Sequence, residues 1–187
     1  MEKLPTPLPG CFELRPRRLE DARGHFVKTF NRDTFAGLGL RTDWTEQYYS
    51  VSRHGVLRGL HFQEPPEDHA KLIYCTAGTV WDVALDLRRG SPTYGRSWHL
   101  QLAATTGNML YLPAGLAHGF YTLSDEATVV YNVTSGYSPK HDKGILWNST
   151  DIPWPEPNPL LSERDHAFPR LADFSSPFSY DSNEAGK

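Results

Sequence analysis

The chain has 187 residues, of which 39% are hydrophobic, 12% aromatic and 22% charged, and its formal net charge is -3. This composition is typical of a globular protein with one core, and an acidic balance without basic runs argues against general nucleic-acid binding. No apolar stretch approaches membrane-spanning length and the first residues lack the apolar core of a signal peptide, so we expect a cytoplasmic protein. The two cysteines, Cys11 and Cys75, have neither a disulfide framework nor metal-ligand spacing.

The first part of the chain is predicted to contain a turn between two short strands, followed by a helix. Residues 21–24 form the turn, because Gly24 is free to take a positive φ. Residues 31–38 form the one clear helix, with Asn31 or Asp33 as its N-cap.

Beyond residue 44 the pattern is almost wholly that of strands bounded by Gly, Pro, Asn or Asp. With the first two included, the expected strands cover residues 11–14, 25–30, 55–63, 71–76, 81–87, 98–102, 109–112, 119–123 and 127–134. Between residues 81 and 87, Val83 and Leu85 share one face and Asp82 lies on the other. Many short strands with scarcely any helix predict an all-β fold, either a β-sandwich or a jelly-roll β-barrel.

The C-terminal part has a different composition. Prolines at alternate positions from 153 to 159 leave little room for sheet pairing. A short helix is expected to start at Ser162, which has Asp165 three residues further on. We therefore expect a single domain over residues 1–187, with residues 175–187 as a flexible tail.

The expected strand at residues 55–63 carries Arg58 and His61 among apolar residues. A buried cation is costly unless an anion meets it, and a histidine takes up a proton near neutral pH. The two residues have opposite parity, so a bulge or twist at Gly59 is needed to turn both towards one cavity. A structural ion pair with a hydrogen-bonded core histidine is the alternative interpretation.

The pattern Pro113-x-Gly115-x-x-His118 resembles the second motif of the cupin superfamily, whose members are small jelly-roll barrels. In many cupins this histidine binds a metal together with a His-x-His and a glutamate of the first motif. Here the first motif falls near His61, which has no second histidine two residues on, and His69 has no matching partner. We therefore expect no metal.

A set without metal remains, with His61 as a candidate base, Lys71 as a cation, Tyr131 as an acid and Asp165 as a carboxylate that orients the histidine. Each of the last three also has a simpler interpretation. Lys71 and Asp165 fit solvated surface charges, and Tyr131 fits a core aromatic residue. The residue types alone leave both interpretations open.

Residues 55–63 resemble the Gly-Val-Leu-Arg-Gly-Leu-His-aromatic-Gln signature of the dTDP-4-dehydrorhamnose 3,5-epimerase family. The resemblance continues in order through most of the chain, at residues 21–26, Lys71, 81–88, 91–93, 113–120, Tyr131, 137–139 and 161–165. It implies a cofactor-free epimerase acting on a nucleotide-linked 4-keto-6-deoxyhexose in deoxysugar biosynthesis. It also implies that His61 is the base, Asp165 its orienting partner, Tyr131 the acid and Lys71 the cation that stabilises the enolate.

The same resemblance implies how substrate is bound. Arg23 and Arg58 would hold the diphosphate, His118 would contact the sugar, and Phe26 and Tyr137 would pack around the nucleotide. It further implies a homodimer in which an N-terminal strand pairs across the two-fold axis.

The chain departs from the family at the nucleotide end. Glu46 and Tyr48 stand where the family usually has the Gln and Asn that help to bind the nucleotide, and Asn148-Ser149 replaces an Asp-Pro pair. CDP- and GDP-linked sugars therefore remain alternatives to dTDP, and inversion at C3, C5 or both stays open. A 3,4-ketoisomerase and a non-catalytic sugar-binding cupin are the competing functions.

Overall fold

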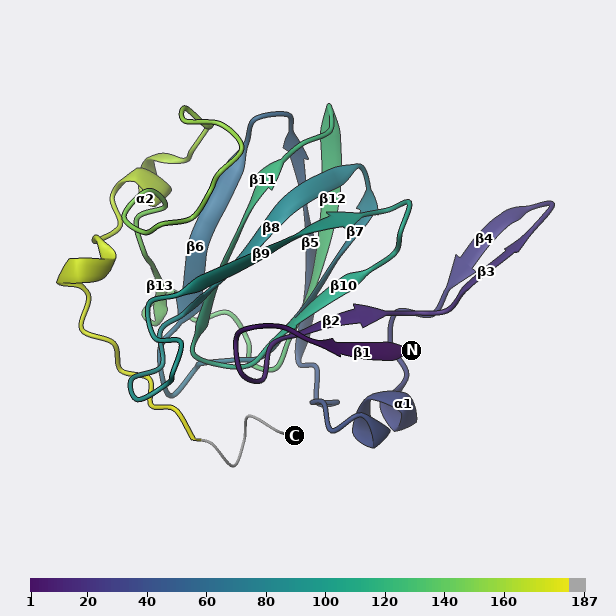
Figure 1. Ribbon diagram of the computed structural model, residues 1–187, viewed down its shortest axis with the longest axis horizontal. Coiled ribbons are helices and arrows are strands. Elements are labelled where there is room, and N and C mark those ends of the chain that lie inside the picture. Colours follow the sequence, from purple (N-terminus) through teal and green to yellow (C-terminus); the bar gives the residue numbers. More distant parts are fainter. Residues whose placement is uncertain (182–187) are drawn as a thin grey trace.

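The computed structural model describes residues 1–181 and consists mainly of two β-sheets that face one another (Figure 1). The strands of the first sheet lie in the order β1 (Glu2–Pro5), β2 (Phe12–Arg15), β10 (Met109–Leu112), β7 (Lys71–Ala77), β12 (Glu126–Val133) and β5 (Glu46–Arg53). Those of the second lie in the order β13 (Asp142–Gly144), β6 (Leu57–Gln63), β11 (Leu116–Thr122), β8 (Thr79–Asp86) and β9 (Ser97–Ala103). The prediction of an all-β jelly roll is confirmed. In the described chain no hydrogen-bonded ladder joins the two sheets, so they do not form a closed barrel.

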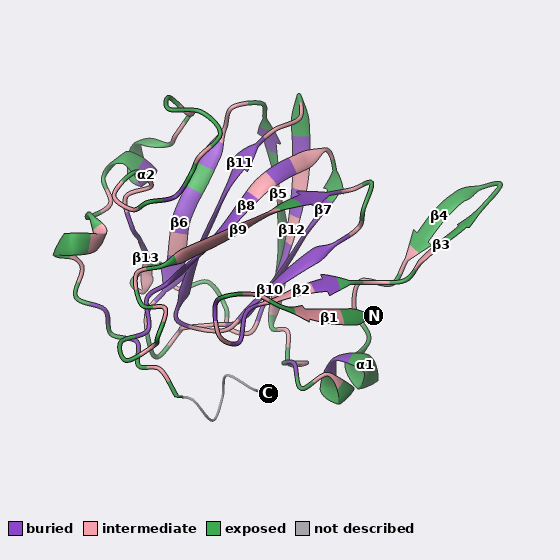
Figure 2. Ribbon diagram, in the orientation of Figure 1, coloured by how far each residue is buried: buried purple, intermediate pink, exposed green. Residues whose placement is uncertain are grey.

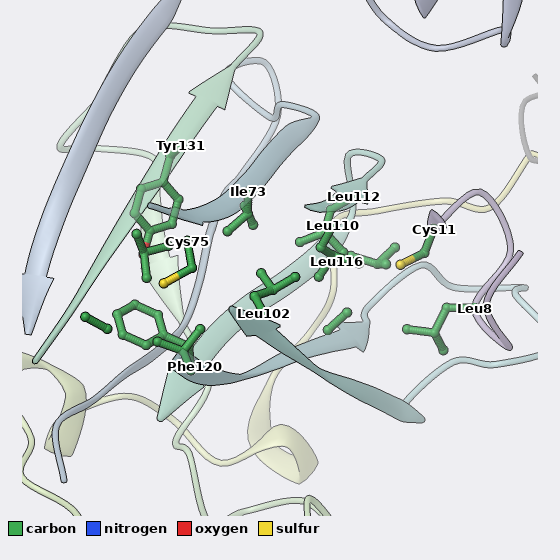
Figure 3. Close-up of a cluster of buried hydrophobic side chains, with 14 residues drawn as sticks. Leu8, Cys11, Ile73, Cys75, Leu102, Leu110, Leu112, Leu116, Phe120 and Tyr131 are labelled. Carbon is green, nitrogen blue, oxygen red and sulfur yellow. The ribbon is translucent and has the colours of Figure 1, made fainter. Parts of the chain in front are cut away.

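The main core fills the space between the two sheets. Phe120 and Leu102 of the second sheet meet Ile73 and Val129 of the first, and all four side chains are fully buried (Figure 3 shows part of this cluster). Burial of such side chains contributes about 1.5–3 kcal/mol each to stability relative to leaving them exposed. This core fixes the spacing of the sheets and therefore of every inward-pointing polar side chain.

Strand β8 is buried on both faces. Val83 and Leu85 share one face, as the alternation predicts, and pack in a second apolar cluster on the outer side of the sheet. Asp82 points to the opposite face, into the space between the sheets, and has an exposed fraction of 0%. A carboxylate at such a position needs a polar partner, and its partner lies in the candidate site.

The C-terminal segment covers the outer cluster of the second sheet. It contains α2 (Glu163–His166) and the 3-10 helix η1 (Leu171–Asp173), and Ile152 packs in the same cluster. Part of the expected flexible tail is packed: Ser176 and Phe178 are each 4% exposed, and the carbonyl of Phe178 accepts a hydrogen bond from Arg89 N. Residues 182–187 of that tail lie outside the described residues.

A hairpin of β3 (Arg18–Asp21) and β4 (Gly24–Val27) projects from the body of the molecule (Figure 1) and is largely exposed (Figure 2). It is followed by α1 (Arg32–Gly37), and the predicted N-cap is confirmed because Asn31 Oδ1 accepts a hydrogen bond from Thr34 N at 3.0 Å. Among the described residues no helix combines the length and the apolar character needed to cross a membrane.

Candidate active site

A β-bulge turns Arg58 and His61 to the same side of β6. His118 pairs with His61 and Phe120 pairs with Arg58, so two residue steps on β11 match three on β6. His118 and Phe120 share one face of β11, and directly paired residues share a face of the sheet. Arg58 and His61 therefore both face the space between the sheets, which confirms the predicted bulge.

Glycines make the bulge possible. Gly59 has a φ of 141°, a region that side-chain-bearing residues rarely adopt. A Cβ atom at Gly59 would lie 2.6 Å from the Cα of Gly119 on β11. The close approach of the two strands thus depends on glycine at both positions.

His61 is oriented by Asp165, as predicted. His61 Nε2 lies 2.8 Å from Asp165 Oδ1, and Asp165 Oδ2 accepts a hydrogen bond from Gly59 N at 3.2 Å. Asp165 sits on α2, where Ser162 Oγ caps the helix by accepting from Asp165 N. Burial would raise the pKa of Asp165, but the hydrogen bonds from His61 and Gly59 hold it below its usual value.

This arrangement selects one tautomer of His61. An ionised Asp165 accepts a hydrogen bond from His61 Nε2–H, which leaves Nδ1 of a neutral imidazole with a free lone pair. The His61 side chain is 30% exposed, whereas that of Asp165 is 5% exposed. The histidine is therefore accessible from the site, and its partner is shielded from water.

Lys71 contacts the backbone of His61. It is 6% exposed, and its ammonium donates a hydrogen bond to the carbonyl oxygen of His61 at 3.1 Å. Burial lowers the pKa of Lys71 to about 8, and the nearby carboxylates of Asp142 and Asp82 partly oppose this shift. Lys71 is thus a buried cation at neutral pH and not a solvated surface charge.

Tyr131 reaches the same space from β12 of the opposite sheet. It is 7% exposed, and burial raises its pKa, so the phenol stays protonated. Its ring meets that of His118 in a T-shaped contact with centroids 5.8 Å apart, and it stacks on Tyr48. His118 Nε2 in turn lies 3.0 Å and 2.9 Å from the two carboxylate oxygens of Asp82, the partner that this buried carboxylate requires.

A cavity of about 390 Å³ opens beside His61 and Lys71. Its lining also includes Glu46, Tyr48, Phe62, Gln63, His69, Val133, Tyr137, Asp142 and Arg164. Arg164 pairs with Asp142 at 2.7 Å, and its guanidinium lies 5.3 Å from the ring centroid of Phe168. Phe168 packs against His61 with ring centroids 5.6 Å apart, so these contacts link the His61 ring to the helix that carries Asp165.

The predicted binding residues divide into two groups. Glu46, Tyr48 and Tyr137 line the cavity, and Arg58 reaches across to β5, where its Nε donates to Ser52 Oγ at 2.9 Å. Arg23 and Phe26 are instead carried on the hairpin that projects from the two sheets (Figure 1), and neither lines the cavity. Within one chain the structure therefore brings together all the predicted site residues except these two.

Asp82, Asp142, Arg164 and Phe168, which contact residues of the site, were not predicted as part of it. For Asp82 the available signal was an acidic residue between two apolar neighbours, Trp81 and Val83. The other three come together only through folding and carry no local signal. Among residues 1–181 no cluster of His, Cys, Asp or Glu side chains is arranged to hold a metal ion.

Comparison with known proteins decides the family. The family model described as dTDP-4-dehydrorhamnose 3,5-epimerase matches residues 5–173 of this chain. The chain belongs to this family. It is 41% identical over 168 residues to the dTDP-4-dehydrorhamnose 3,5-epimerase of Shigella flexneri, a match that covers 88% of this chain and 93% of that protein.

Solved structures of family members superpose closely on this chain. The dTDP-6-deoxy-D-glucose-3,5-epimerase of Legionella pneumophila, in complex with dTDP-4-keto-L-rhamnose, has a TM-score of 0.92 and 32% identity, covering 97% of this chain and 99% of its own. A 3'-monoepimerase of Streptomyces bikiniensis, in complex with dTDP-quinovose, has a TM-score of 0.85 and 36% identity, covering 90% and 87%. Relatives of this chain thus include both double and single epimerases.

Proposed function

We propose that this protein epimerises a dTDP-linked 4-keto-6-deoxyhexose, at C3, C5 or both, without a cofactor. Epimerase activity on a nucleotide-linked deoxysugar follows from family membership. The observation that supports the detailed proposal is the position of two candidate proton-transfer groups on opposite sheets. His61, paired with Asp165, lies on β6, and Tyr131 lies on β12, so a sugar between the sheets would have a base on one face and an acid on the other.

The chemistry needs no group beyond the side chains and the substrate. The C4 ketone makes the hydrogens on C3 and C5 acidic, and His61 Nδ1 takes one of them as a proton. The resulting enolate carries negative charge on its oxygen, which the Lys71 ammonium stabilises. Tyr131 then donates its phenolic proton to the opposite face of the carbon, so the configuration inverts, and solvent restores both groups.

The assignment of the nucleotide rests on similarity and on the cavity. The Legionella and Streptomyces structures hold dTDP sugars, and Arg58, which faces the space between the sheets, offers a guanidinium suited to a diphosphate. Glu46 and Tyr48 both line the cavity, and they present a carboxylate and a phenol where the family usually has amides. Because amides donate and accept while a carboxylate only accepts, we expect weaker discrimination for thymine than is typical of the family.

A homodimer would complete the site. Strand β5 is the last strand of the first sheet, and one of its edges is unpaired within residues 1–181. The projecting hairpin exposes Leu19 by 46% and Phe26 by 59%, which is typical of a segment that packs on a partner. We propose that each hairpin reaches the second copy and brings Arg23 and Phe26 to its site; a monomer by light scattering at micromolar concentration would contradict this.

The function is tested by incubating the protein with dTDP-, CDP- and GDP-linked 4-keto-6-deoxyhexoses and following the product by NMR. We expect inverted product at C3 or C5, with the ketone still at C4. A ketone found at C3 would identify a 3,4-ketoisomerase. Tight binding of these sugars without turnover would identify a sugar-binding protein.

A further inference from the structure

Tyr48 lies directly opposite Tyr131 in the ladder between β5 and β12. Directly opposed residues of antiparallel strands place their side chains on the same face, so both rings point between the sheets. The rings stack with centroids 4.9 Å apart and an interplanar angle of 19°. Tyr131 is therefore held between the Tyr48 ring and the T-shaped contact with His118.

The two stacked tyrosines differ in exposure. Tyr48 is 44% exposed, whereas Tyr131 is 7% exposed, so Tyr48 is the outer ring of the pair and separates the inner one from solvent. Stacking of this kind limits rotation of the inner ring, because the outer ring occupies the space into which it would turn. The exclusion of water also preserves the burial that keeps the Tyr131 phenol protonated.

We propose that Tyr48 is a positioning residue for the acid: its ring holds Tyr131 in the orientation that delivers a proton to the far face of the enolate. This role rests on the proposed function of the site and is distinct from recognition of the nucleotide. The phenolic hydroxyl of Tyr48 takes no part, because the stack involves the ring alone.

The neighbouring residue provides a matched control. Tyr49 is on the same strand, points to the opposite face and is 69% exposed. Tyr48→Leu removes the planar ring but keeps an apolar side chain, Tyr48→Phe keeps the ring, and Tyr49→Leu makes the same change outside the site. Each variant is compared with the parent protein in heavy water. NMR measures the inverted product and, separately, the deuterium in uninverted substrate. Light scattering checks the oligomeric state of each variant.

We expect Tyr48→Leu to lower the rate of inversion about tenfold, the order of one aromatic contact. The rate at which deuterium enters uninverted substrate should stay within about twofold of the parent rate, because His61 still forms the enolate. Tyr48→Phe keeps the stacked ring, so its ratio of inversion to exchange should stay that of the parent, and Tyr49→Leu should leave both rates near those of the parent. In a Tyr131→Phe background, Tyr48→Leu should have no further effect on inversion, since the group that it positions is already gone.

Three results would overturn the proposal. Equal loss of inversion and exchange in Tyr48→Leu would mean that Tyr48 serves the base or the fold. A raised KM with unchanged kcat would mean that it binds substrate only. A further loss of inversion in the Tyr131→Phe background would show that it acts independently of the acid, whereas absence of epimerisation in the parent protein would refute the proposed function itself.

Discussion

Replacing Asp165 with asparagine tests how the base is oriented. The two oxygens of Asp165 serve different donors: Oδ1 accepts from His61 Nε2 at 2.8 Å and Oδ2 accepts from Gly59 N at 3.2 Å. An asparagine has one oxygen and one NH₂ group, so it can accept in only one of these two directions. Either Gly59 N loses its acceptor, or the amide donates to His61 and forces the opposite tautomer.

Both outcomes have calculable consequences. A buried N–H left without an acceptor costs about 1–3 kcal/mol of stability. A hydrogen bond to a charged group contributes about 1.5–3 kcal/mol, so loss of orientation alone slows proton abstraction about 10- to 150-fold. If the tautomer reverses, Nδ1 carries the proton and cannot act as a base, and the loss approaches the roughly 10⁴-fold effect of the equivalent change in a serine-protease triad.

The assay is the rate at which substrate carbon hydrogens exchange with heavy water, because exchange reports enolate formation whether or not inversion follows. We expect Asp165→Asn to lower this rate by at least about tenfold. Glu163→Gln makes the same change at an exposed position of the same helix and should leave the rate unaltered. An Asp165→Asn protein that is folded and retains half of the parent exchange rate would refute the orienting role of Asp165.

Three further predictions follow from the same site. Because the pKa of Lys71 is lowered to about 8, its ammonium is present below that pH and lost above it, so kcat should fall as pH rises through 8. The guanidinium in Lys71→Arg stays charged, so an unchanged fall of kcat at alkaline pH in this variant would show that another group titrates. Activity should survive prolonged treatment with a chelator, and its loss and restoration by one divalent ion would contradict a metal-free mechanism. Free dTDP, CDP and GDP should compete with similar strength for the site next to Glu46 and Tyr48; a clear preference for dTDP would mean that these two substitutions are neutral.

Local features of the sequence were sufficient to predict most elements of the fold. The cap of α1 at Asn31 and the cap of α2 at Ser162 depend on residues three positions away, so the signal lies within one turn of helix. The alternation in β8 correctly separated Val83 and Leu85 from Asp82. Period-two patterns identify the two faces of a strand, but they do not reveal that both faces are buried.

Contacts between distant segments were not accessible in this way. His61 and Asp165 are 104 positions apart; the residue types offered their pairing as one of two open interpretations, and only the family resemblance favoured it. The contacts of Arg164 with Asp142 and Phe168 depend on how the C-terminal segment crosses the second sheet, which no local pattern specifies. For the hairpin that carries Arg23 and Phe26, the turn at residues 21–24 and the strand after it were predicted, but β3 was not, and the projection of the hairpin became evident only in three dimensions.

The central claim, that base and acid act on opposite faces of the sugar, is tested most directly by comparing His61→Ala with Tyr131→Phe in heavy water. His61→Ala removes the base, so exchange of substrate hydrogens should nearly vanish together with inversion. Tyr131→Phe keeps the ring and its packing but removes the acid, so deuterium should enter uninverted substrate while little inverted product forms. If Tyr131→Phe abolishes exchange as completely as His61→Ala does, Tyr131 is required for enolate formation or for binding, and the two-face mechanism is wrong.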